Sequence, residues 1–293
     1  MKEISKPARL LIAFVLTLIC VICLIPIISI ISISISSDQQ LLAEGYSLLP
    51  RGLSTEGYKY VFNDVSKILN AYKVSIIRTV VGTVIGLALN ALFAYVLSRP
   101  NYRYRNALTV FLTIPMVLNA GLVPTYITMT QTLNLKDTWM VLILPLAVVP
   151  WYIILMRTFF SQIPYELSES ARIDGAGEFR IFWNVVLPLA KPALATIGMF
   201  LALSYWNDWY YNMLYIDDKS MNGLQYMLYR MMSDVLELTR SAARSGMNIS
   251  IADMPTESMR MAMCMVAAGP MLVVFPFFQK YFVKGLTVGS VKG

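Results

Sequence analysis

Six long apolar stretches, almost free of charge, alternate with polar segments along the chain. They are Leu10–Ile35, the stretch between Arg78 and Arg99, and the stretches within Asn106–Thr132, Thr138–Met156, Pro192–Met213 and Met261–Phe278. About 20 apolar residues in a helix cross the hydrocarbon core of a bilayer. The pattern therefore predicts an all-α, polytopic membrane protein with six transmembrane helices. The first stretch is too long for a signal-peptide core and is expected to be a retained helix.

Prolines and polar segments refine this outline. We expect a kink at Pro26 in the first span and interruptions at Pro115 and Pro124 in the third. The predicted organisation is an N-terminal transmembrane helix, a first outer loop and a five-helix core, at residues 1–36, 37–75 and 76–293. Within the core we expect a cytoplasmic polar loop and a second outer loop, at residues 162–192 and 216–258.

The methionine-rich stretch Leu224–Arg244 in the second outer loop has a helical pattern. Methionine surfaces adapt to different partners. The stretch is thus expected to be a helix that docks on a partner or packs on its own bundle.

Composition supports the membrane class and removes several functions. Hydrophobic residues make up 57% of the chain and charged residues 14%, whereas a soluble domain carries about a quarter charged residues. There is no histidine, the commonest general base and metal ligand. Cys20 and Cys23 lie in an apolar segment without a second ligand pair, so helix packing explains them better than a metal site. We therefore expect no catalytic residue and no metal ligand.

Basic residues suggest the orientation. The net charge of +7 is expected to mark cytoplasmic loops rather than nucleic-acid binding, because short cytoplasmic loops are rich in Lys and Arg. The short loop after the second span has three arginines and the short loop after the third has only Lys136. The longer outer loops carry nearly as many basic residues, so the assignment rests on the short ones. It places both termini and the 162–192 loop in the cytoplasm.

The cytoplasmic loop contains a spaced pattern. It reads Glu169-Ser170-Ala171, three residues, Gly175, nine residues, Val185, one residue, Leu187-Pro188. Pro164 suits the first turn of a helix, and glycine suits a left-handed helix end. We expect one helix over Tyr165–Ile173, a turn at Asp174-Gly175, and a second helix over Phe179–Val186 that Pro188 closes. Glu169 and Arg172 should share one face. A connector lying on the headgroups is the alternative interpretation.

This pattern resembles the "EAA" loop of permease subunits in binding-protein-dependent ABC importers. The chain departs from the family form only at Ser170 and Val185, which replace Ala and Ile. Segments at 45–50, 172–176 and 279–293 resemble carbohydrate permeases, in particular the smaller maltose-type permease and the permeases for complex oligosaccharides. The resemblance implies the type I ABC importer permease fold in a bacterial cytoplasmic membrane.

The resemblance also implies partners: a second permease, two ATPase subunits, an extracellular solute-binding protein and a sugar or oligosaccharide. The sequence contains no G-x-x-x-x-G-K-[ST] loop, so ATP and Mg²⁺ are expected on the partner ATPase and no cofactor on this chain. The ATPase-docking residues implied by the family are Glu169, Ser170, Ala171, Asp174, Gly175, Ala176, Leu187 and Pro188.

The substrate path is sought among aromatic and hydrogen-bonding side chains, which bind sugars. The candidates are Asn119 and Tyr126 in the third span and Tyr205, Trp206, Asn207 and Asp208 at the outer end of the fifth. An interfacial aromatic belt explains the second group equally well, and a hydrogen bond between helices explains Asn119. Gly82-x-x-x-Gly86 predicts a close contact between helices.

Other functional classes remain as alternatives. A membrane enzyme would need a nucleophile–base pair or metal ligands, and a channel or ion-coupled carrier would not need the 169–188 pattern. Within the ABC permeases, an importer for an amino acid or peptide is the runner-up. The sequence does not name the sugar.

Overall fold

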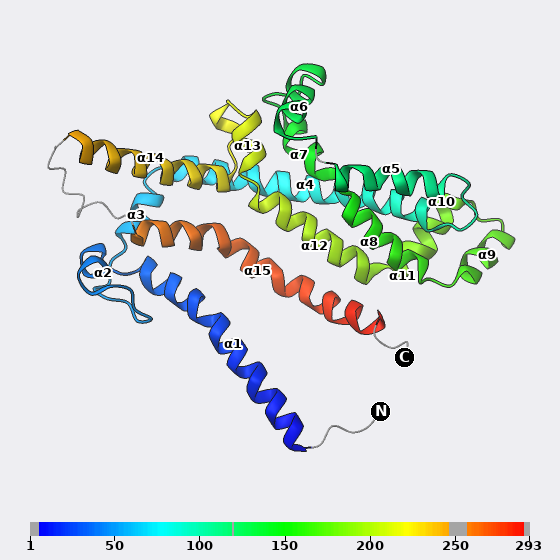
Figure 1. Ribbon diagram of the computed structural model, residues 1–293, viewed down its shortest axis with the longest axis horizontal. Coiled ribbons are helices and arrows are strands. Elements are labelled where there is room, and N and C mark those ends of the chain that lie inside the picture. The colour runs from blue at the N-terminus through cyan, green and yellow to red at the C-terminus, as the bar shows by residue number, and fades with distance from the viewer. Residues whose placement is uncertain (1–5, 119, 246–256, 290–293) are drawn as a thin grey trace. The chain divides into compact units, whose positions relative to one another are not determined.

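The computed structural model describes residues 6–118, 120–245 and 257–289, and these residues form helices without any strand. Figure 1 shows their succession. The long helices are α1 (Lys6–Ser34), α4 (Val65–Ser98), α12 (Lys191–Asn207), α14 (Leu224–Ser245) and α15 (Glu257–Gly289). The shorter ones are α2 (Asp38–Glu44), α3 (Glu56–Val61), α5 (Arg105–Val117), α6 (Leu122–Ile127), α7 (Trp139–Ala147), α8 (Pro150–Ser161), α9 (Tyr165–Ile173), α10 (Glu178–Ile181), α11 (Leu187–Leu189) and α13 (Tyr210–Tyr215). Two π-helical turns, η1 (Thr128–Thr132) and η2 (Phe182–Val186), and the 3₁₀ turn η3 (Lys219–Met221) complete the set.

The described residues form two compact units, one from those within 1–68 and 228–270 and the other from those within 69–227 and 271–293. In the first unit, Asp38 caps α15. Its carboxylate accepts the backbone N–H groups of Glu257 (2.9 Å) and Ser258 (3.2 Å) and the Ser258 hydroxyl. A carboxylate at a helix N-terminus satisfies otherwise unpaired donors. The segment after α1 is thereby fixed to the start of α15.

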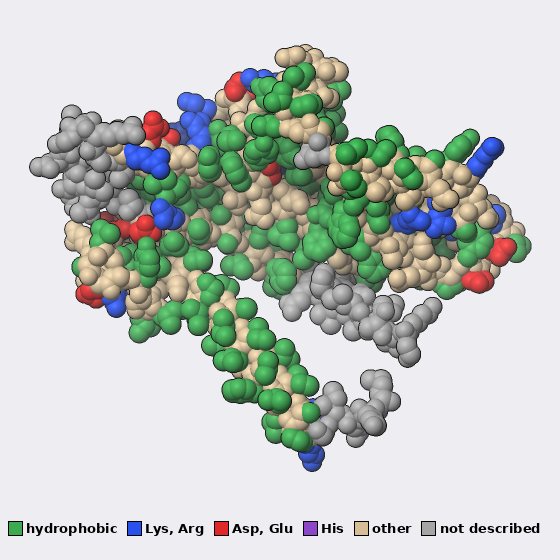
Figure 2. Space-filling model, viewed as in Figure 1, with side chains coloured by type: hydrophobic (Ala, Val, Ile, Leu, Met, Phe, Trp, Pro, Cys, Tyr) green, Lys and Arg blue, Asp and Glu red, His purple; other side chains and the backbone are tan. Residues whose placement is uncertain are grey.

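Among the described residues, three helices are long and apolar enough to cross a membrane: α1, α4 and the Glu257–Pro276 part of α15. Three bent pairs, α5 with α6–η1, α7 with α8, and α10–α11 with α12, bring the number to six if each pair is one span. This count agrees with the sequence prediction. Figure 2 shows hydrophobic side chains along the visible face of α1, as expected for a helix whose solvent is lipid.

The second span differs from its prediction at one end. We expected it to begin after Arg78, but α4 begins at Val65. Arg78 does not limit the helix because it is buried and pairs with Asp208, with 3.1 Å between Nη1 and Oδ2. A paired charge can lie inside the bundle where an unpaired one cannot.

The third and fourth spans are broken. The third breaks between α5 and α6, where Gly121 has φ +87°, rather than at Pro115 or Pro124. Pro124 lies in the first turn of α6, where its missing N–H costs no helical hydrogen bond. The fourth span bends by 50° before Pro150, because proline disfavours a helical conformation in the residue before it. This second break is not among the features predicted from the sequence.

Buried Asn90 of α4 fills the break between α7 and α8. Its side-chain amide donates to the carbonyls of Gly86 (2.6 Å) and Ala147 (2.8 Å), and its Oδ1 accepts the N–H of Val149 (3.1 Å). Backbone groups freed by a bend in a membrane helix need such partners. Asn90 therefore stabilises the bent form of this span.

The predicted glycine contact is confirmed. A Cβ on Gly82 would come within 2.5 Å of the Tyr205 ring, and one on Gly86 within 3.2 Å of the Ala147 carbonyl oxygen. The missing side chains let α4 approach α12 and α7 closely. The Tyr205 ring occupies the space beside Gly82, and its hydroxyl donates a hydrogen bond to the Ile143 carbonyl at 2.7 Å.

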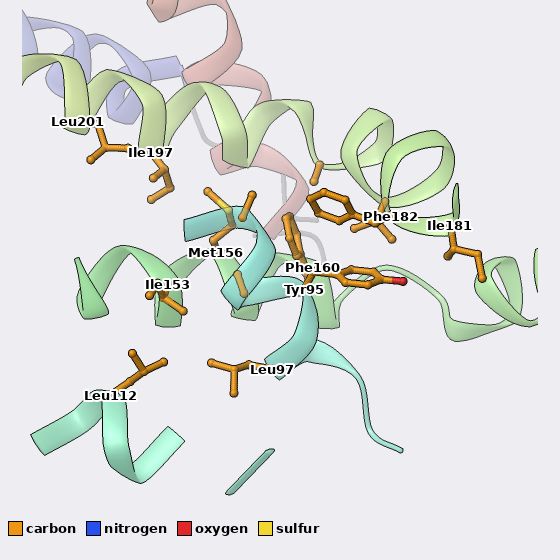
Figure 3. Close-up of a cluster of buried hydrophobic side chains, with 14 of the residues drawn as sticks. Tyr95, Leu97, Leu112, Ile153, Met156, Phe160, Ile181, Phe182, Ile197 and Leu201 are labelled. Carbon is orange, nitrogen blue, oxygen red and sulfur yellow. The ribbon is translucent and has the colours of Figure 1, made fainter. Parts of the chain in front are cut away.

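The main core of the second unit gathers side chains from α4, α5, α8, α10, η2 and α12 (Figure 3). Its centre includes Leu97, Ile153, Met156, Phe182 and Ile197, all nearly inaccessible. The segment after Gly175 is thus built into the core. This arrangement positions the candidate functional site.

Candidate functional site

The predicted helix–turn–helix is present, and we call residues 164–189 the hairpin. Its first helix, α9, begins after Pro164 and ends at Ile173, as predicted. Gly175 adopts φ +81°, a left-handed conformation that glycine reaches without steric cost. The N–H of Ala176 donates to the Ala171 carbonyl at 2.9 Å and closes the helix end. The turn therefore requires glycine for its backbone conformation.

The second half of the hairpin is longer than predicted. It runs through α10, the π-helical turn η2 and α11, and ends at Leu189 rather than at Val186. Pro188 does not close it, since proline is tolerated in the first turn of the helical segment that follows η2. The chain then turns by 84° into α12.

The hairpin has an inner and an outer face. Ala171, Ala176 and Leu187 pack against the main core. The other predicted docking residues are exposed: Glu169, Ser170, Asp174, Gly175 and Pro188. The outer face also carries large apolar side chains that the sequence analysis did not single out, Ile173, Phe179 and Trp183, which are 83%, 72% and 62% exposed. Exposed apolar residues among charges mark a surface that contacts a protein partner or the membrane.

Charged side chains gather on the hairpin, as the view in Figure 2 shows over α9. Arg172 forms an ion pair with Glu178 across the turn and donates to the Tyr165 hydroxyl at 3.1 Å. The Tyr165 hydroxyl and the Glu178 carboxylate raise the pKa of Arg172 above its ordinary value. Glu169, on the face predicted to include Arg172, has no ion pair within the described part of the chain, so its carboxylate is available to a partner.

The C-terminal end of α4 contacts both halves of the hairpin. The Tyr95 hydroxyl donates to the Glu178 carboxylate at 2.7 Å and to the Glu178 carbonyl at 3.1 Å. Arg99 lies 4.2 Å from the centre of the Tyr95 ring and donates to the buried Ser168 hydroxyl at 2.9 Å. Sequence reasoning missed Tyr95 and Glu178, because their contact joins residues 83 positions apart and no local spacing indicates it.

The candidates at the end of α12 lie in different surroundings. Tyr205 and Trp206 are buried, and Trp206 lies 6.4 Å from Tyr72 between ring centres. Asn207 is exposed. The side chain of Asp208 pairs with Arg78 and accepts the N–H groups of Tyr210 and Tyr211, each at 3.1 Å. Asp208 thus ends α12 and begins α13, and the role of all four residues in a substrate path stays a prediction.

Tyr126 stacks on Tyr215, with ring centres 5.7 Å apart and an interplanar angle of 13°, and Tyr215 stacks in turn on Tyr211. Nearby, Asp137 accepts the N–H groups of Asp218 (3.0 Å) and Asp217 (2.6 Å), which lower the pKa of its carboxyl group. These contacts hold the loop before α7 against the segment after α13. Asn119, the other candidate in the third span, lies outside the described residues.

Comparison with known proteins shows extensive similarity. The family model for the "binding-protein-dependent transport system inner membrane component" matches residues 82–288. Protein LplC of Bacillus subtilis (strain 168) is 38% identical over 260 residues, which cover 89% of this chain and 86% of that protein. The polygalacturonan/rhamnogalacturonan transport system permease protein YtcP of the same organism is 35% identical over 266 residues, 89% of each chain.

The fold is also similar to a solved structure. A chain in the crystal structure of a bacterial ABC transporter involved in the import of the acidic polysaccharide alginate superposes with a TM-score of 0.79 and 31% identity. The match covers 96% of this chain and all of that chain. The similarity thus extends over nearly the whole length of both chains.

Proposed function

Because this chain belongs to the family of inner membrane components of binding-protein-dependent transport systems, we propose that it pairs with a second, related permease. Together the two form the membrane pathway for a sugar or oligosaccharide. A solute-binding protein delivers this solute from outside, and two partner ATPases supply the energy. The chain is a transport component, and in this proposal ATP hydrolysis, with its ATP and Mg²⁺, belongs to the partners rather than to this chain.

The main structural support for this proposal is the exposed outer face of the hairpin, which an ATPase can bind. Its outer face combines the exposed Glu169 carboxylate with exposed Ile173, Phe179 and Trp183, and its inner face is part of the core. An ATPase that binds the outer face would act on a rigid element rather than on a loose loop. ATP binding can favour one permease conformation only through such differential contact.

The orientation follows from the partners. ATP is a cytoplasmic ligand, so an ATPase bound at the hairpin places the hairpin in the cytoplasm. Six spans then place both termini on the same side, and the α13–α14 segment outside. The short basic loop after α4 supports this orientation.

The relatives support an oligosaccharide as the solute. One is named for polygalacturonan and rhamnogalacturonan transport, and the alginate transporter imports another polysaccharide. We propose that this chain handles oligosaccharides derived from a polysaccharide of this kind.

A deletion strain tests the proposal. Cells lacking only this chain are offered labelled oligogalacturonides, rhamnogalacturonan oligosaccharides and alginate oligosaccharides, and a dipeptide and an amino acid as controls. We expect uptake of at least one oligosaccharide to be lost and to return with the wild-type gene. Loss of amino-acid or dipeptide uptake, with all oligosaccharide uptake unchanged, would replace the carbohydrate assignment by the runner-up.

A further inference from the structure

The hairpin is attached to α4 by polar contacts that the docking function alone does not require. Tyr95 reaches α10 through the Glu178 carboxylate at 2.7 Å, and Arg99 reaches α9 through the Ser168 hydroxyl at 2.9 Å. Arg172 joins the two halves of the hairpin through its ion pair with Glu178. Two adjacent turns of α4 therefore hold both halves of the hairpin at once.

These polar contacts fix the relative position of two surfaces that otherwise meet through apolar packing. The Tyr95 ring packs on Phe182 with 4.9 Å between ring centres, and such packing by itself tolerates sliding. A hydrogen bond depends steeply on distance and angle, and one to an ionised group is about twice as strong as a neutral one. The Glu178 carboxylate uses one oxygen for Tyr95 and the other for Arg172. The hairpin thus cannot shift along α4 without breaking a charge-assisted bond.

We propose that Tyr95 and Glu178 form a latch through which a movement of the hairpin is transmitted to α4. This inference rests on the proposed function, because the movement comes from a bound ATPase. α4 also carries Gly82 and Asn90, which contact α12 and the break between α7 and α8. A shift of α4 therefore reaches both neighbouring spans. Tyr95 and Glu178 are positioning residues, since they act through the helix and not on the solute.

The test uses the assembled complex of both permeases and the ATPases, purified through a tag on the ATPase, with ATP plus vanadate as the probe. Hydrogen exchange is measured with and without the probe in peptides from the hairpin and from residues 85–98 of α4. In the wild type, the hydrogen exchange of both regions should change when the probe is added; we call this change the response of each region. Tyr95→Phe removes only the hydroxyl and keeps the ring packing. We expect the hairpin response to persist and the α4 response to fall by about half or more, because the lost bond weakens the attachment by about tenfold.

Two further variants sharpen the result. Glu178→Gln keeps an acceptor for the Tyr95 hydroxyl but replaces the ion pair with Arg172 by a weaker contact. The α4 response should therefore fall less in this variant than in Tyr95→Phe. Tyr104→Phe is the matched control, since the Tyr104 side chain is exposed and its hydroxyl makes no hydrogen bond to the described part of the chain. It should respond like the wild type.

The outcomes separate the latch from the proposed function. An α4 response in Tyr95→Phe equal to that of the wild type would overturn the latch and leave docking intact. Loss of the ATPase from the Tyr95→Phe complex would also overturn it, since the residue would then serve docking. A wild-type hairpin that does not respond, or a wild-type chain that binds no ATPase, would instead refute the proposed function and the latch with it.

Discussion

At the scale of single residues, the hairpin shows that two nearby glycines have different reasons to be there. A Cβ would meet nothing within 4 Å at either Gly175 or Gly177. Gly175 has φ +81°, whereas Gly177 has an ordinary φ of −71°. Steric space therefore does not distinguish them, and backbone conformation does.

The same substitution at both positions gives a prediction. Gly175→Ser should strain the turn by about 1–2 kcal/mol, the cost of a left-handed conformation for a residue with a Cβ. The affinity for the ATPase should fall by about tenfold as a result. Gly177→Ser should leave it unchanged, since serine is a good residue before a helix. Copurification at increasing concentrations of the ATPase measures its affinity for both variants. Equal affinities in the two variants would contradict the role of the turn.

At the scale of elements, the break between α7 and α8 depends on one side chain from another helix. Asn90 pairs with the Ala147 carbonyl before the break and the Val149 N–H after it. Neither α7 nor α8 supplies partners for these groups at the bend. The bend is therefore a property of the assembled bundle as well as of Pro150.

Asn90→Leu should destabilise this arrangement. The leucine has a similar size but leaves buried backbone groups unpaired, each at a cost of about 1–3 kcal/mol. We expect a lower thermal midpoint of the detergent-solubilised complex. Asn70→Leu, on the same helix, is the control, because Asn70 bonds the Ser220 carbonyl at an exposed site where water can replace it. A midpoint for Asn90→Leu as high as that of the control would show that the break is held in another way.

At the scale of the whole molecule, the chain divides its aromatic and polar residues between packing and exposed surface. Trp206 is 3% exposed and packs near Tyr72, whereas the next residue, Asn207, is exposed. The same division separates Phe182 in the core from Phe179 on the outer face of the hairpin. Neighbours in sequence can thus serve stability and recognition separately.

This division predicts different effects for two adjacent substitutions. Trp206→Ala should reduce the amount of assembled complex, since truncating a buried aromatic residue costs about 3–5 kcal/mol. Asn207→Ala should leave assembly unchanged and weaken the apparent affinity for the sugar by about tenfold or less, the value of one lost hydrogen bond. Uptake divided by the amount of assembled complex separates the two. Normal uptake per complex in Asn207→Ala would remove it from the substrate path.

The sequence by itself determined the membrane class, the number of spans, the glycine contact at Gly82 and the turn at Gly175. These depend on hydrophobic runs and on backbone conformation, which are local properties. The α9 boundaries could be predicted for the same reason. The resemblance added the family, because the spacing of the 169–188 pattern is also local.

Only the tertiary structure decided which polar residues pair across helices. The sequence predicted that Arg78 limits a span, whereas in the structure Arg78 lies inside α4 and pairs with Asp208. Asn90 and Tyr95 likewise carry no local signal of their partners, Ala147 and Glu178. A buried polar group must find a partner wherever the fold provides one. In a bundle that partner comes from a distant segment, so spacing along the chain does not reveal it.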